Sequence, residues 1–62
     1  MSTASQLSSM STSLTELTER LSRLAEQLEG TEQSDVATAL YEVERSLEMA
    51  SRRLEQVVND LG

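Results

Sequence analysis

The sequence predicts an all-α fold: an antiparallel helical hairpin with coiled-coil heptads that dimerises into a four-helix bundle. Three observations predict it. Apolar residues recur at alternating steps of three and four along two stretches, the stretches have matched lengths, and one short polar segment around Gly30 separates them. An average step of about 3.5 residues is typical of left-handed supercoiled helices that pack knobs into holes. Two such helices joined by a turn form a hairpin.

The first stretch predicts a helix over about residues 5–29, roughly 37 Å long. Its apolar row consists of Leu7, Met10, Leu14, Leu17, Leu21, Leu24 and Leu28. Ten of the first 18 residues are Ser or Thr, which compete for backbone hydrogen bonds and are mediocre helix formers. An alternative start lies at Ser13, because Ser13 and Glu16 fit a capping box, which would leave residues 1–12 disordered. Leu7 and Met10 keep the register of the row, so we favour the longer helix.

The turn is predicted at about residues 30–31. Gly30 stands where a left-handed C-cap is needed after the first helix. Thr31 or Ser34 is expected to cap the second helix, and Glu32 and Asp35 favour its positive N-terminal end. The connection between the two helices is therefore only a few residues long.

The second helix is predicted over about residues 32–61. Its apolar row consists of Val36, Leu40, Val43, Leu47, Ala50, Leu54, Val57 and Leu61. Small residues beside both rows, among them Ala25, Ala37 and Ser51, let helices approach closely and widen the packing face to the arc that a bundle needs. A lone hairpin buries its rows on one side only, so we expect self-association. We predict that all fifteen residues of the two rows form the core and dimer packing.

The turn and the start of the second helix resemble a known family. The stretch from Leu28 to Ala37, continuing to Leu40 and Leu47, is similar to the bend of the Rop (repressor of primer) family of plasmid proteins. The positions identical to the family are Leu28, Glu32, Gln33, Asp35, Leu40 and Leu47. The resemblance implies a homodimer of helical hairpins that forms an antiparallel four-helix bundle.

The same resemblance bears on RNA binding. The family binds paired RNA loops through an exposed face of its first helix that bears Lys, Asn, Phe and Gln. The matching positions here are Ser2, Ser9, Ser13, Leu17 and Leu24. None of these is an RNA-contacting residue type of the family, so the resemblance carries over a fold and no RNA site.

The amino-acid composition argues against catalytic and metal-binding sites. The chain has 62 residues, which make one small domain, and it contains no His, Cys, Trp or Phe. The carboxylates of Glu42, Glu44 and Glu48 predict a solvated acidic face, because metal sites in bundles pair Glu with His. Ser and Glu on exposed helix faces lack an activating base. We therefore expect no catalytic residue, no metal site and no cofactor, and the chain is not predicted to be an enzyme.

The net charge of the chain disfavours some classes of binding partner. The formal net charge of −6 disfavours attraction to nucleic acid or to an anionic membrane surface. The basic residues are Arg20, Arg23, Arg45, Arg52 and Arg53. No apolar run is long enough to span a membrane and the N-terminus lacks the pattern of a signal peptide, so we expect a cytoplasmic protein.

These observations favour a structural or adaptor module that acts through protein–protein contacts, with itself and an unidentified protein as partners. A small Rop-like RNA-binding regulator is the alternative, disfavoured by the charge. Tyr41, the sole aromatic residue, is expected to pack near the turn, and Met49, which lies off the rows, is a candidate exposed contact.

Overall fold

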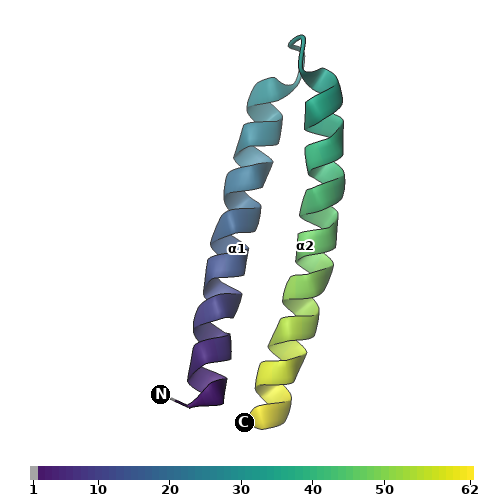
Figure 1. The fold of residues 1–62 in the computed structure, drawn as a ribbon. Coiled ribbons are helices and arrows are strands. Elements are labelled where there is room, and N and C mark those ends of the chain that lie inside the picture. Colours follow the sequence, from purple (N-terminus) through teal and green to yellow (C-terminus); the bar gives the residue numbers. More distant parts are fainter. Residues whose placement is uncertain (1) are drawn as a thin grey trace.

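The computed structural model describes residues 2–62, which form two long helices lying side by side in opposite directions (Figure 1). Helix α1 spans Thr3–Leu28 and helix α2 spans Ser34–Leu61. Both ends of the chain lie at the end of the hairpin away from the turn. The predicted all-helical hairpin is therefore confirmed. The Cα trace measures 46 × 17 × 9 Å, so the molecule is one layer of helices thick.

Helix α1 begins at Thr3, two residues before the predicted start. The hydroxyl oxygen of Ser2 accepts a hydrogen bond of 3.1 Å from the backbone N–H of Ser5 and caps the helix. The alternative start at Ser13 is wrong, because Ser2 supplies an N-cap eleven residues earlier and the helix runs without interruption from there.

The many hydroxyls of α1 are accommodated within the helix. Thr12, Thr15 and Thr18 each donate a hydrogen bond from the side-chain hydroxyl to the backbone carbonyl four residues earlier, at 3.3, 3.1 and 2.8 Å respectively. These bonds satisfy the hydroxyls locally and leave the backbone helical. The Ser and Thr content of this half therefore does not break the helix.

Gly30 ends the first helix. Its φ of 73° places it in the left-handed region, as the sequence predicted, and it is the one residue of the described chain with a positive φ. Glu29 precedes it in an extended conformation, and its N–H donates to the carbonyls of Ala25 and Glu26.

Hydrogen bonds of Thr31 stabilise the turn, and the second helix begins only after it. Its hydroxyl donates to the carbonyl of Leu28 at 2.6 Å and accepts from the N–H of Gln33 at 3.1 Å. Helix α2 consequently begins at Ser34, two residues later than predicted, and the connection covers residues 29–33. The predicted capping by Ser34 is wrong, because Gln33 occupies the N-cap position and makes no side-chain capping bond.

The two helices touch through small side chains. The buried residues of the described chain are Thr18, Ala25 and Ala37, with 9%, 0% and 2% of their surface exposed. They belong to two rows with a spacing of seven, here called the small-residue rows. These rows are Ala4, Ser11, Thr18 and Ala25 on α1, and Ala37, Glu44, Ser51 and Val58 on α2, in which Glu44 and Val58 are the two larger members. All their members are buried or half-buried, so the interior of the hairpin is narrow.

Within residues 2–62, neither helix has the length and hydropathy that crossing a membrane requires.

Candidate functional site

Half of the predicted apolar residues are not covered by the hairpin. They form two rows, here called the outer rows: Met10, Leu17 and Leu24 on α1, and Val36, Val43, Ala50 and Val57 on α2. Apart from the small Ala50, which is also exposed, each leaves between 43% and 58% of its surface open. A single exposed apolar residue is ordinary, whereas a continuous exposed patch marks an interaction surface.

The remaining predicted residues lie between the outer rows and the small-residue rows. These leucine rows are Leu7, Leu14, Leu21 and Leu28 on α1, and Leu40, Leu47, Leu54 and Leu61 on α2. All are half-buried except Leu61, which is 54% exposed at the end of α2. The sequence thus identified the apolar residues, and the structure shows that the hairpin alone covers only part of them.

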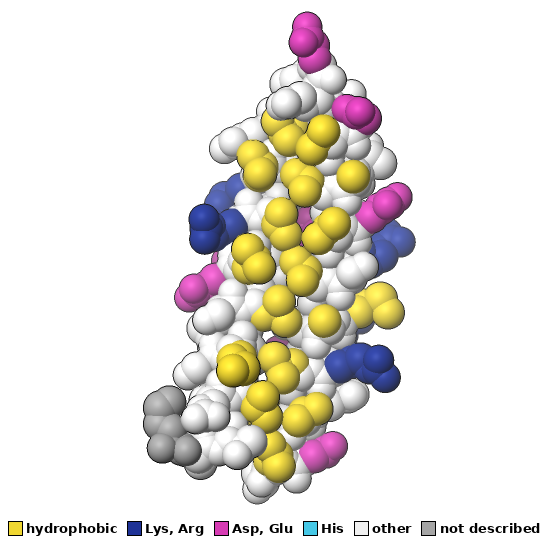
Figure 2. All heavy atoms as spheres, in the orientation of Figure 1, with side chains coloured by type: hydrophobic (Ala, Val, Ile, Leu, Met, Phe, Trp, Pro, Cys, Tyr) yellow, Lys and Arg dark blue, Asp and Glu magenta, His cyan; other side chains and the backbone are white. Residues whose placement is uncertain are grey.

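The outer rows and leucine rows together make one continuous surface, here called the apolar face. Figure 2 shows this face as a band of hydrophobic side chains that runs along both helices from the turn to the chain ends, with charged side chains at its margins. The opposite faces of α1 and α2 do not carry such rows, because their residues at these positions are mainly Ser, Thr, Glu and Arg. The hairpin is therefore amphipathic as a whole.

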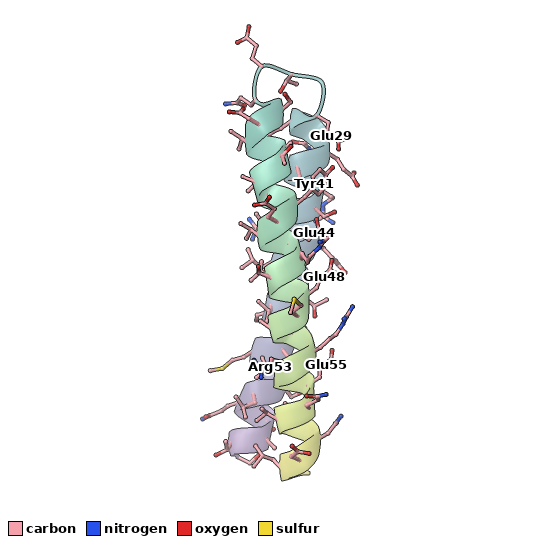
Figure 3. All side chains as sticks on the ribbon, turned by 90° about the vertical axis from the view of Figure 1, so that its right-hand side faces the viewer. Glu29, Tyr41, Glu44, Glu48, Arg53 and Glu55 are labelled. Atoms are coloured by element: carbon pink, nitrogen blue, oxygen red, sulfur yellow. The ribbon has the colours of Figure 1, made fainter. Side chains whose placement is uncertain are left out.

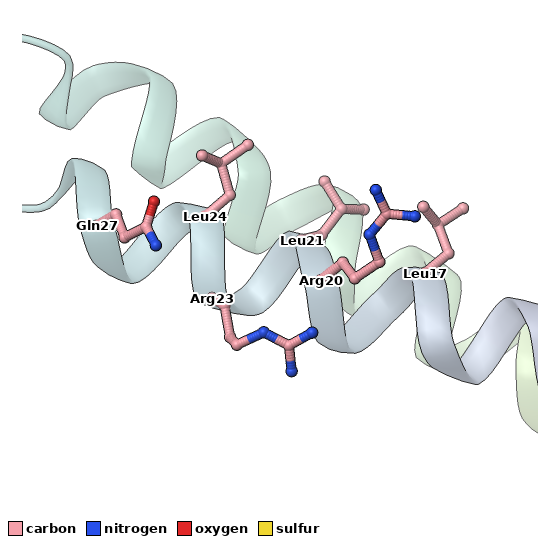
Figure 4. Close-up of a pocket in the computed structure, with 6 residues that line it drawn as sticks. All are labelled: Leu17, Arg20, Leu21, Arg23, Leu24 and Gln27. Carbon is pink, nitrogen blue, oxygen red and sulfur yellow. The ribbon is translucent and has the colours of Figure 1, made fainter.

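A shallow hollow marks the α1 margin of the apolar face. Leu17, Leu21, Leu24 and Gln27 line it together with Arg20 and Arg23, and its volume is about 390 Å³. In the close-up, the three leucines project to one side of α1, Arg20 extends beside them, and Arg23 lies on the other side of the helix (Figure 4). Arg20 is thus the basic group nearest to the apolar face on α1.

A second hollow lies further along α1, beside the short side chains of Ser9 and Ser13. It is lined by these two serines and by Met10, Leu14 and Leu17, and its volume is about 400 Å³. The short hydroxyl side chains leave the flanks of Met10 and Leu14 open. Both hollows are open surface depressions.

The reverse side of the hairpin is polar and acidic. Tyr41 donates a hydrogen bond of 2.7 Å from its hydroxyl to a carboxylate oxygen of Glu29, which ties α2 to the end of α1. Figure 3 shows Tyr41, Glu44, Glu48 and Glu55 along α2, with Arg53 on its other side. Tyr41 thus lies near the turn, as expected from the sequence, and its contact there is polar.

The Glu29 carboxylate also changes the acidity of Tyr41. The hydrogen bond to Glu29 raises the pKa of Tyr41 from 10.0 to about 12, and partial burial and the negative charges of Glu29, Glu26 and Glu44 act in the same direction. Among residues 2–62, no group of three or more acidic side chains converges in a way that could hold a metal ion. The anchored Tyr41 is thus the distinctive feature of the polar side.

The five residues singled out by the resemblance to the Rop family do not lie together on one polar surface. Leu17 and Leu24 belong to the apolar face, and Ser9 and Ser13 line the second hollow. Ser2 caps α1. The structure thus assigns these side chains to packing surfaces and to the helix start.

Comparisons with known proteins give no match to a protein-family model, a curated protein or a solved structure.

Proposed function

We propose that this chain is a non-enzymatic assembly module: its apolar face pairs with a second copy, forms a four-helix bundle, and so presents a charged outer surface for contacts with other proteins. The observation that carries the proposal is the continuous exposed apolar face. Stable domains bury apolar surface between at least two layers of secondary structure, and this hairpin supplies one layer of 9 Å.

The size of the face suits a second copy. The Cα trace extends 46 by 17 Å, so the face is large enough to supply the roughly 800 Å² of accessible surface that each partner buries in a standard interface. A second hairpin has a face of the same length, width and apolar composition. Homo-oligomers with twofold symmetry use the same surface on both subunits, so one apolar face is sufficient to build the dimer.

The charges of the chain do not oppose this pairing. Most of the excess of 11 acidic over 5 basic residues lies away from the apolar face, on the reverse side and around the turn. The predicted bundle would therefore carry its net charge outside, where water and salt screen it. A strongly charged exterior also keeps the bundle from associating further.

The test is molar mass by light scattering over a dilution series, with circular dichroism on the same samples. The full chain is expected to be a dimer that loses helicity on dissociation. Leu17→Glu places a charge at the centre of the apolar face and is expected to abolish the dimer. Thr12→Glu adds the same charge on the outer side of α1 and is the matched control, expected to remain dimeric.

Two results would contradict the proposal. A folded, fully helical monomer at all concentrations would show that the apolar face needs no partner. Salt-sensitive binding of RNA hairpins by the dimer would contradict a role that is confined to protein contacts.

A further inference from the structure

We infer that the two copies pair with their turns at the same end of the bundle, so that α1 of each copy packs against α2 of the other. This inference rests on the proposed self-association and specifies its geometry. Two twofold arrangements bring the apolar faces together. With the turns at the same end, the axis runs parallel to the helices; with the turns at opposite ends, it runs across them and pairs α1 with α1 and α2 with α2.

The hairpin itself fixes the heights of its residues along the bundle. Side chains of the two helices that line common hollows, such as Thr18 with Glu48 and Ser11 with Glu55, have residue numbers that add to about 66, so side chains with this sum lie at the same height. A twofold axis parallel to the helices leaves every height unchanged. The heights within one hairpin therefore predict which residues of α1 meet which residues of the partner's α2.

The outer rows differ in size between the helices. The outer row of α1 is long (Met10, Leu17 and Leu24), whereas that of α2 is short (Val36, Val43, Ala50 and Val57). The long and short rows face each other only when α1 packs against α2 of the partner. Facing large and small residues interdigitate and fill the space between helices, which is the packing that a well-ordered core requires.

The heights of the two outer rows also match. Leu24 lies close to the height of Val43, Leu17 lies close to that of Ala50, and Met10 lies close to that of Val57. Each long side chain of one copy thus faces a short side chain of the other. A twofold axis parallel to the helices preserves height, so this match follows from the hairpin alone.

With the turns at opposite ends, side chains of similar size would face each other across the dimer. Leucine and methionine would meet leucine and methionine between the two α1 helices, and valine and alanine would meet valine and alanine between the two α2 helices. The α1 helices would be held further apart than the α2 helices. One interface would be crowded and the other underfilled, and both faults reduce stability.

The decisive experiment measures distances between copies. The chain contains no cysteine, so Glu32→Cys at the turn and Asn59→Cys near the chain ends each provide one site for a nitroxide label. Double electron–electron resonance on the Glu32→Cys dimer is expected to give a separation below about 30 Å, because neighbouring helices in a bundle lie roughly 8–10 Å apart. The Asn59→Cys dimer is expected to give a similarly short separation.

Other outcomes overturn the inference in distinguishable ways. Separations that approach the 46 Å length of the hairpin at both sites would show turns at opposite ends and overturn the orientation while leaving the dimer intact. A monomer in light scattering of the unlabelled chain would overturn the proposed function and the orientation with it.

Discussion

Shortening one side chain at the middle of the apolar face measures the association of the hairpins with little effect on the hairpin itself. Leu17 is 46% exposed, so close to half of its surface remains for a partner to cover. Full burial of a leucine contributes about 1.5–3 kcal/mol, so Leu17→Ala is expected to cost about 1 kcal/mol per copy and about 2 kcal/mol per dimer. That loss corresponds to a roughly 30-fold higher dissociation constant.

The assay is sedimentation equilibrium of the wild-type chain and the Leu17→Ala variant at several concentrations. Leu21→Ala is the informative comparison, because Leu21 is half-buried beside α2 and its truncation is expected to destabilise the hairpin as well as the dimer. Arg52→Ala, on the outside, serves as the neutral control. A change of less than about threefold for Leu17→Ala, or one no larger than that of Arg52→Ala, would refute the assignment of the outer row to the dimer interface.

Three further predictions follow from single contacts. Glu29→Gln is expected to lower the pKa of Tyr41 from about 12 towards 10.0, measured from the absorbance of the sole tyrosine, whereas Glu42→Gln is expected to leave this pKa unchanged. Because the pKa of Tyr41 is raised in the folded state, the Tyr41–Glu29 bond stabilises the fold fully below pH 10, and this stability is lost as the pH rises through 12. Gly30→Ala is expected to cost about 1–2 kcal/mol in thermal unfolding through the positive φ alone, because an added Cβ would meet no atom within 4 Å; an unchanged melting temperature would contradict this. Ala25→Leu is expected to cost about 1–3 kcal/mol in urea unfolding by forcing the helices apart, and a fully stable variant would argue against the close approach of the helices.

The path of the chain was predictable from the sequence, because both signals that define it are local. The spacing of apolar residues depends only on helical geometry, and Gly30 is the residue type that adopts a positive φ without steric cost. The helix ends were less predictable. The start at Thr3 depends on a hydroxyl of Ser2 that could equally have faced solvent, and the start of α2 depends on two hydrogen bonds made by Thr31 within the turn.

The sequence did not predict which apolar residues are half-buried in the hairpin and which are exposed, because this depends on how each helix is rotated about its own axis. A row with steps of three and four covers a broad arc, and either edge of the arc can face the neighbouring helix. The structure selects the edge that carries Thr18, Ala25 and Ala37. A signal was present in the sequence: small residues recur every seven positions at Ala4, Ser11, Thr18 and Ala25. Their spacing matches that of the leucines three positions further on.

The distribution of side-chain sizes is what the proposed pairing of two hairpins requires. The chain places its small residues, such as Ala25 and Ala37, where the two helices touch, and it leaves larger ones, such as Leu17 and Leu24, on the surface. A hairpin that had to be stable alone would gain by the reverse order, because burying a leucine contributes more than burying an alanine. Small residues at the contact bring the helices close together and spread the leucines over one face. That arrangement forfeits stability in the isolated hairpin and recovers it only when a second apolar surface covers the face, so folding and association are expected to occur as one transition whose midpoint rises with chain concentration.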